Sequence, residues 1–294
     1  MKLGPADFDY DVINAFVKSG QKGMLTAFKG DPATRGSELQ ISYYLNVGQP
    51  FKADFMMGNY TDKIVNYTII CLIDYEQREF LFDNHPAKAH FVSIKPGDRL
   101  IFPLKVTDLK KGAHDLILFA VAISADSNIM QDADNRFLFH RANVFVESYS
   151  FPKLSFKKLR HTSTDVDASI LAISKSDKYD INDSIDKVTS LSKDRSYYLH
   201  VSNPNNEVSA SVAVLFSDLN QAYGQFSGND IFYHFLESKS QSSIKLLPRL
   251  TDQVKSLWAI SVENPYIVLE PEPGKMTQKP TFLRISNIMK FNTQ

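Results

Sequence analysis

The stretch Arg99-Leu-Ile-Phe-Pro-Leu-Lys-Val-Thr107 places an apolar side chain at every second position. This period of two is typical of a half-buried β-strand, and residues 41–47 alternate in the same way. Residues 66–74 and 115–123 are apolar on both faces, as central strands or domain-interface strands are. Turn-forming residues separate these stretches, and many short strands at such spacing indicate an all-β sandwich or barrel.

The composition is close to that of an average globular protein. The 294 residues include 33 basic and 33 acidic side chains, and 43% of them are hydrophobic. This balance argues against a disordered tail and against a polybasic protein that binds nucleic acid. No uninterrupted apolar run approaches the ~20 residues that cross a bilayer as a helix. The single cysteine, Cys71, cannot form an intrachain disulfide, and we expect it to be buried in a strand.

Four segments of the first half of the chain recur in the same order in the second half. The matched pairs are 41–50 with 196–204, 66–76 with 210–220, 102–108 with 247–252, and 119–123 with 258–262. The separation falls along the chain, from 154 residues between Tyr43 and Tyr197 to 139 between Phe119 and Trp258. Shorter loops in the second copy would produce such a decrease. The pattern therefore indicates two copies of one β module.

The repeat predicts two domains, 1–150 and 151–294, the first of which includes an N-terminal segment of about 1–22. Within that segment, residues 11–18 fit either a short helix or a first strand. Pro103 and Pro248, 145 residues apart, fall in the same place of the two copies. Because proline removes a backbone donor, we expect that strand to be an edge strand or to carry a bulge.

The order of these segments resembles tandem immunoglobulin-like or fibronectin-III-like modules. Residues 96–106 and then 112–121 are similar to the back half of many such modules, where one strand ends in a Gly-containing turn and the next runs through the core. The Cys-Trp-Cys pattern of antibody domains is absent. The resemblance implies two tandem immunoglobulin-like β-sandwiches. It implies nothing about function, because this fold serves many roles.

Three tyrosines are candidate binding residues. Tyr44 and Tyr198 occupy the predicted solvent faces of strands matched in the repeat, and Tyr223 lies beside the middle strands of the second copy. Exposed aromatic side chains can anchor a protein partner or stack on sugar rings. Ordinary packing across strands is the alternative interpretation.

Calcium is a candidate cofactor at one loop. Asp126, Asp132 and Asp134 lie within 124–135 together with amide side chains, and oxygen ligands of this kind suit a hard cation. A solvated turn is the alternative interpretation. His114-Asp115 follows another turn, and we explain that pair by hydrogen bonding at the surface.

Sequons for N-glycosylation begin at Asn59, Asn66 and Asn182, and this short pattern also occurs by chance. The sequence has no Gly-x-Ser-x-Gly elbow and no phosphate-binding glycine loop, so we expect no enzyme. A hydrolase on a sandwich scaffold would require convergent His, Asp or Ser groups.

We interpret the chain as a non-catalytic exported or cell-surface protein, which binds a protein partner or an envelope component or serves as a scaffold at the cell envelope. This places the protein outside the cytoplasm, with its export signal or anchor not part of the chain. The alternative function is a carbohydrate-binding accessory module that uses the exposed tyrosines.

Overall fold

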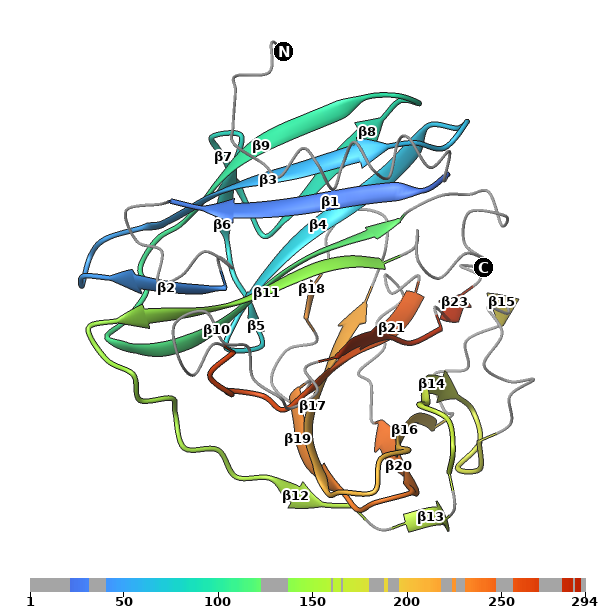
Figure 1. Ribbon diagram of the computed structural model, residues 1–294. Helices are drawn as coiled ribbons and strands as arrows, with labels where there is room; N and C mark the ends of the chain where they lie inside the picture. Colours follow the sequence, from blue (N-terminus) through green and yellow to red (C-terminus); the bar gives the residue numbers. More distant parts are fainter. Residues whose placement is uncertain are drawn as a thin grey trace. The chain divides into compact units, whose positions relative to one another are not determined.

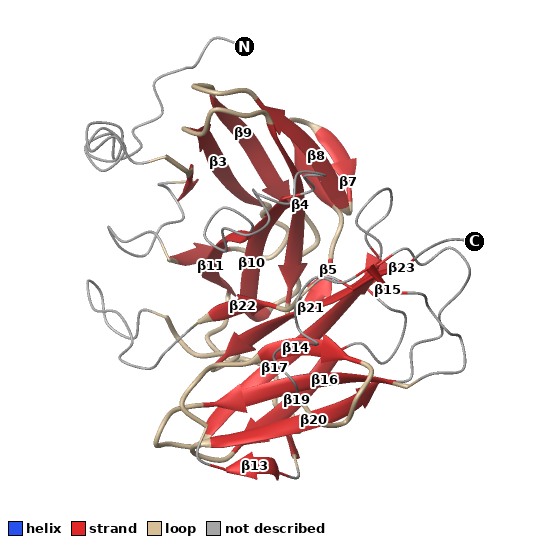
Figure 2. Ribbon diagram, turned by 90° about the vertical axis from the view of Figure 1, so that its right-hand side faces the viewer, coloured by secondary structure: helices blue, strands red, loops and turns tan. Residues whose placement is uncertain are grey.

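The computed structural model describes residues 22–31, 41–122, 137–159, 161–164, 166–179, 188–189, 196–217, 224–225, 231–246, 256–269, 282–287 and 289–291. All regular secondary structure in these ranges is β-strand (Figure 2), which confirms the all-β fold class. No helix long and apolar enough to cross a bilayer occurs in the same ranges. The segment 11–18, predicted as a helix or a strand, lies outside the described residues.

The chain divides into two compact units. The first unit consists of residues 1–152 together with 268–277, and the second consists of 153–267 together with 278–294. Within each unit, two sheets pair into a β-sandwich (Figure 1).

The first unit contains one sheet in the order β1-β3-β9-β6-β7 and another in the order β2-β11-β10-β4-β5, with β8 also paired to β4. Its strands are β1 (Met24–Gly30), β2 (Ser42–Leu45), β3 (Phe51–Asn59), β4 (Val65–Ile73), β5 (Glu76–Gln77), β6 (Phe80–Phe82), β7 (His85–Ala87), β8 (Ala89–Ile94), β9 (Arg99–Val106), β10 (Gly112–Ala122) and β11 (Phe137–Val146). After β3 the chain crosses to the second sheet at β4, returns to the first at β6, crosses again at β8, returns at β9 and crosses once more at β10. Antiparallel strands that alternate between two sheets in this way form an immunoglobulin-like sandwich.

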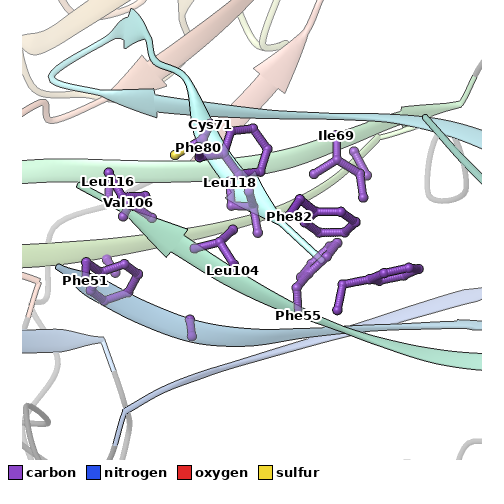
Figure 3. Close-up of a cluster of buried hydrophobic side chains, with 14 of the residues drawn as sticks. Phe51, Phe55, Ile69, Cys71, Phe80, Phe82, Leu104, Val106, Leu116 and Leu118 are labelled. Carbon is purple, nitrogen blue, oxygen red and sulfur yellow. The ribbon is translucent and has the colours of Figure 1, made fainter. Parts of the chain in front are cut away.

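Alternate side chains of these strands fill the space between the two sheets. Phe51 and Phe55 of β3 and Leu104 of β9, from one sheet, face Ile69 of β4, from the other, across a core that excludes water (Figure 3). Cys71 lies in this core with no exposed surface, as expected, and burial raises the pKa of its thiol to about 12. The thiol therefore stays protonated and acts as a small apolar side chain.

The second unit contains sheets in the orders β12-β19-β17-β21-β23-β15 and β13-β20-β16-β14, with β18 also paired to β17 and β22 to β21. Its strands are β12 (Lys157–Lys158), β13 (His161–Thr164), β14 (Leu171–Ser174), β15 (Val188–Thr189), β16 (Tyr197–Asn203), β17 (Ser209–Ser217), β18 (Gly224–Gln225), β19 (Ile231–Leu236), β20 (Ser240–Leu246), β21 (Ser256–Glu263), β22 (Leu283–Ile285) and β23 (Met289–Phe291). A separate apolar core, which includes Tyr197, Leu199 and Leu257, fills its interior.

Strand pairing repeats between the two units. The antiparallel set β1-β3-β9 corresponds to β14-β16-β20, and the set β8-β4-β10 corresponds to β19-β17-β21. Even the parallel pair of β2 with β11 has a counterpart, in the parallel pair of β15 with β23. The two units are therefore copies of one sandwich, which confirms the predicted internal repeat.

The strand pairing corrects three of the four predicted matches, one of them at Pro103. The match of 66–76 with 210–220 is right, because β4 corresponds to β17 at a separation of 144 residues. The match of 41–50 with 196–204 is wrong, because the counterpart of β16 is β3 and the counterpart of β2 is β15. Phe119 corresponds to Ile260 and not to Trp258, two positions away on the same face. Short strands rich in Tyr and Leu look alike in sequence whichever sheet they join.

Pro103 does not mark an edge strand or a bulge. Strand β9 lies between β3 and β6, and its register with β3 is regular. Proline fits there because the pairing of β6 with β9 stops at Leu104, and among the described residues it is the turn residue Asp83, not a strand, that lies opposite Pro103. The register makes Lys245 the counterpart of Pro103, since Pro103 pairs with Asp54 and Lys245 with the corresponding Tyr198. Pro248 lies outside the described residues.

Candidate recognition surface

An exposed group of aromatic side chains lies at the edge of the first unit, on the β2 side of its second sheet. It comprises Tyr44, Phe145, Tyr149 and Phe151, and we call it the aromatic patch. The ring of Tyr44 stacks on Phe145 at 5.3 Å, and Tyr149 lies 5.0 Å from Phe145 and 5.7 Å from Tyr44. Tyr149 is 70% exposed and Tyr44 is 40% exposed, whereas Phe145 beneath them is buried.

Strand pairing brings these residues together from distant parts of the sequence. The parallel register of β2 with β11 places Tyr44 opposite Phe145. Beyond β11, the backbone of Glu147 takes a left-handed conformation (φ 48°), and its N–H donates to the Leu45 carbonyl. The segment that follows is held against β10 by a hydrogen bond from the Ala113 N–H to the Ser150 carbonyl (3.2 Å). Tyr149 is therefore held at a defined place beside β2.

The patch can bury apolar area and offer hydroxyl groups to a ligand at the same time. Exposed hydrophobic residues scattered singly are normal, but a contiguous group indicates an interaction surface. The two exposed rings, of Tyr44 and Tyr149, are inclined to each other by 55°. They form an angled pair of anchors, and a flat platform for a sugar ring would need them nearly coplanar.

Of the other predicted site residues, the structure describes Tyr198 alone, which belongs to the second unit. Tyr198 lies half-buried in β16, and its counterpart in the first unit is Asp54, so Tyr44 and Tyr198 do not occupy equivalent strands as predicted. Tyr223 lies outside the described residues. So do the predicted calcium ligands Asp126, Asp132 and Asp134. Within the ranges that are described, no three His, Cys, Asp or Glu side chains are arranged to hold a metal ion.

A network of charged side chains lies beside the segment that supports the patch. His114 places its Nδ1 2.6 Å from Oδ2 of Asp74 and its Nε2 2.8 Å from the carbonyl oxygen of Lys110. The other carboxylate oxygen of Asp74 accepts the Asp115 N–H. His114 is 9% exposed and Asp115 has no exposed surface, so explaining this pair by surface hydrogen bonding was wrong. The alternation of the sequence does not reveal partners that lie 40 residues away.

A buried ion pair completes this network, which we call the His114 cluster (Asp74, Tyr75, His114, Asp115 and Arg141). The Arg141 Nε donates to Oδ1 of Asp115 at 2.8 Å, and its Nη2 donates to Oδ2 at 2.5 Å. The Tyr75 hydroxyl donates to the same carboxylate. Burial alone would lower the pKa of Arg141, but the Asp115 charge outweighs this effect and raises it. Arg141 therefore stays charged, and the cluster joins the β4–β5 turn to β10 and β11.

A second polar group, in the other unit, surrounds His200 of β16. Its Nε2 lies 2.8 Å from Ser174 Oγ, and its Nδ1 lies 2.8 Å from Ser243 Oγ. Both serine hydroxyls also reach backbone carbonyls, those of Ser176 and Asp177. His200 has no exposed surface, and its contacts with the two serines fasten residues 174–177 to the sheet.

Comparisons with known proteins give structural likeness but no family by sequence. No family model matches the chain, and no curated protein does either. The CARDB domain of the PF1109 protein from Pyrococcus furiosus, solved with two metal ions, is 11% identical over 42% of this chain and 88% of its own (TM-score 0.25). The N-terminal domain of PorA is 9% identical over 41% and 97% (TM-score 0.25). Red sea bream transglutaminase is 9% identical over 89% of this chain, which spans 32% of the transglutaminase (TM-score 0.25).

The fold assignment rests on the strand order within each unit and not on these likenesses. The protein is a tandem pair of immunoglobulin-like β-sandwiches, as the sequence predicted. Its first unit presents a cluster of exposed aromatic side chains.

Proposed function

We propose that the protein is a non-catalytic binding module of the cell envelope, located outside the cytoplasm, and that it takes a protein partner on the aromatic patch. One observation carries the proposal: two exposed tyrosines contact each other and a buried phenylalanine at the edge of a rigid sheet. Tyrosine is enriched at the energetic centres of protein interfaces because it buries a large area at a small cost in conformational entropy.

The geometry of the rings favours a protein over a carbohydrate. A sugar ring binds best on one aromatic plane, whereas rings inclined by 55° fit the irregular surface of an apolar side chain. The patch also has polar neighbours that can form the rim of an interface. Glu147 and Lys111 pair at 3.7 Å beside the patch, and both are exposed. An apolar centre with a polar rim is the usual anatomy of a protein interface.

We also propose that the protein is not an enzyme. The serine–histidine contacts of the second unit involve a histidine without exposed surface, and the hydroxyls reach backbone carbonyls. The hydrogen bonds that these groups make within the second unit give them a structural role.

Site-specific photocrosslinking on intact cells tests the proposed function. A benzophenone amino acid at position 149 should give a covalent adduct that protease digestion identifies as a defined protein. The same probe at position 198, on a half-buried tyrosine of the other unit, is the matched control. An adduct removed by glycosidase treatment would support the carbohydrate alternative instead, and equal labelling from both positions would contradict a specific site.

Affinity for the captured partner provides the second measurement. Tyr149→Ala and Tyr44→Ala should each weaken binding by about tenfold or more, as hot-spot truncations do. Tyr198→Ala should leave the affinity unchanged.

The proposed location is tested by adding a protease to intact cells. Degradation of the protein is expected, and complete protection would contradict a position at the cell surface.

A further inference from the structure

The His114 cluster is connected to the aromatic patch through a short loop. Lys110 supplies the carbonyl that faces His114 Nε2, and the next residue, Lys111, pairs with Glu147 at the end of β11. Glu147 in turn accepts the Val47 N–H at 3.1 Å, next to β2. The loop therefore joins His114 to the two segments that carry Tyr44 and Tyr149.

The protonation state of His114 follows from its partners. A carboxylate oxygen and a carbonyl oxygen face its two ring nitrogens, and neither oxygen can donate a hydrogen bond. Only an imidazolium ring, with a proton on each nitrogen, satisfies both contacts. A neutral ring would leave one nitrogen lone pair against an oxygen, which repels it.

We propose that protonated His114 locks the loop at Lys110 and Lys111, and that loss of this proton loosens the support of the aromatic patch. The patch is thus organised for binding while His114 carries both ring protons and is less organised once one of them is lost. The consequence for binding rests on the function proposed above, whereas the link between His114 and the 147–150 segment does not.

Other charged groups around His114 act in the same direction on balance. Burial by itself lowers the pKa of His114, but the hydrogen bond to Asp74, the Lys110 carbonyl and the Asp74 charge together outweigh burial and the opposing charge of Arg78, so the pKa is raised. Arg78 lies in a separate exposed pair with Glu76. Asp115 is neutralised by Arg141 and adds no unpaired charge.

The sign of the pH effect follows from this direction. A histidine whose pKa is raised on folding contributes stability that is fully present below its ordinary value of 6.5. The contribution is lost as the pH rises through the higher pKa of the folded state. The change therefore lies above pH 6.5.

Nuclear magnetic resonance of the intact protein tests the link without any partner. The ring resonances of His114 should show both nitrogens protonated at about pH 6 and a pKa above the ordinary histidine value. The backbone amides of residues 147–151 should shift with the same midpoint, and their hydrogen exchange should accelerate above it. A neutral His114 at about pH 6, or amides at 147–151 that do not follow its titration, would overturn the proposal.

A matched pair of variants separates the proposal from the proposed function. His114→Gln should remove the alkaline change and weaken partner binding about fivefold or more at about pH 6. His85→Gln is the control, because His85 is exposed and contacts the Asp83 carbonyl. Binding at the patch that is independent of both pH and His114 would overturn the switch and leave the binding function intact. If the amides at 147–151 follow His114 but crosslinking from position 149 captures no partner, the switch is supported and the binding function is contradicted.

Discussion

Both sandwiches contain an asparagine whose side chain donates hydrogen bonds to backbone carbonyls at an equivalent position, although the sequences around it differ. In the first unit, the Asn59 Nδ2 donates to the carbonyls of Lys63 and Ile94, both at 2.8 Å. In the second unit, the Asn203 Nδ2 donates to the carbonyls of Glu207 (2.7 Å) and Leu236 (3.3 Å). Each asparagine ends the strand before the chain changes sheets, and it ties that crossing to the end of β8 or β19.

This comparison also explains the sequon at Asn59. The side chain has no exposed surface, and its amide nitrogen already donates to two carbonyls. Asparagine is required there by the geometry of the crossing, so the match to a glycosylation sequon is incidental.

The two units differ in how they fill the position of Asp115. The strand register makes Ser256 its counterpart. Asp115 is bound by Arg141 and Tyr75, whereas the buried hydroxyl of Ser256 makes no hydrogen bond in the part of the chain that the structure describes. The second unit forms the same sandwich with a serine at this position. The buried ion pair of Asp115 with Arg141 is therefore not required by the fold, and its presence in the first unit needs a different explanation.

The chain has two natural reporters that distinguish the units. Its single cysteine, Cys71, is buried in the first unit, and its single tryptophan, Trp258, is buried in the second. Urea unfolding followed by thiol labelling reports on the first unit, and tryptophan fluorescence reports on the second.

The largest expected effect is at Asp115. Asp115→Ala removes the carboxylate that neutralises the buried Arg141 charge, which costs about 3–5 kcal/mol. Thiol labelling should show the loss as a lower urea midpoint. Ser256→Ala is the matched change in the second unit and should be neutral or stabilising in the fluorescence transition. Equal losses in both variants would contradict the assignment of the ion cluster to the first unit alone.

The second largest loss of stability is expected at the two equivalent asparagines. Asn59→Ala and Asn203→Ala each remove the side-chain donor of a buried carbonyl, that of Ile94 or that of Leu236, at a cost of about 1–3 kcal/mol. Asn59→Ala should lower the midpoint of Cys71 labelling, and Asn203→Ala that of the Trp258 transition, by similar amounts. A large loss in one unit with none in the other would show that the two asparagines are not equivalent.

The smallest effect concerns the turn that follows β8 and β19. Gly97 (φ 78°) and its counterpart Lys239 (φ 50°) both take left-handed conformations. No atom lies within 4 Å of a Cβ built on Gly97, so Gly97→Lys should cost only the backbone strain, about 1 kcal/mol. Lys239→Gly should change the free energy of unfolding by less, because relief of strain is offset by the greater freedom of the unfolded chain. A Gly97→Lys variant as stable as the wild type would contradict this account of the turn.

The sequence predicted the strands well and their equivalence less well. The stretches 41–47, 66–74, 99–107 and 115–123 correspond to β2, β4, β9 and β10. Alternation tells which side chains share a face, but a shift of two residues leaves the pattern unchanged. For this reason the sequence matched Phe119 with Trp258, two positions from its true counterpart Ile260.

The candidate site shows the same limit of sequence patterns. Tyr44 could be found because it lies on the polar side of an alternating strand. Tyr149 lies after β11, where the sequence has no period, and only the parallel pairing of β2 with β11 brings the two rings together. The partners of His114 and Asp115 come from Asp74 and Arg141, and no local pattern predicts contacts across 40 and 26 residues.

The contact of Tyr44 with Tyr149 is the feature on which the proposed function depends most directly. Nuclear Overhauser spectroscopy of the intact protein measures it through cross-peaks between the two ring systems and between each ring and Phe145. The account predicts all three sets, together with backbone cross-peaks of a parallel pair between β2 and β11. Ring cross-peaks missing between Tyr44 and Tyr149, in a protein that retains the β2–β11 pairing, would contradict it.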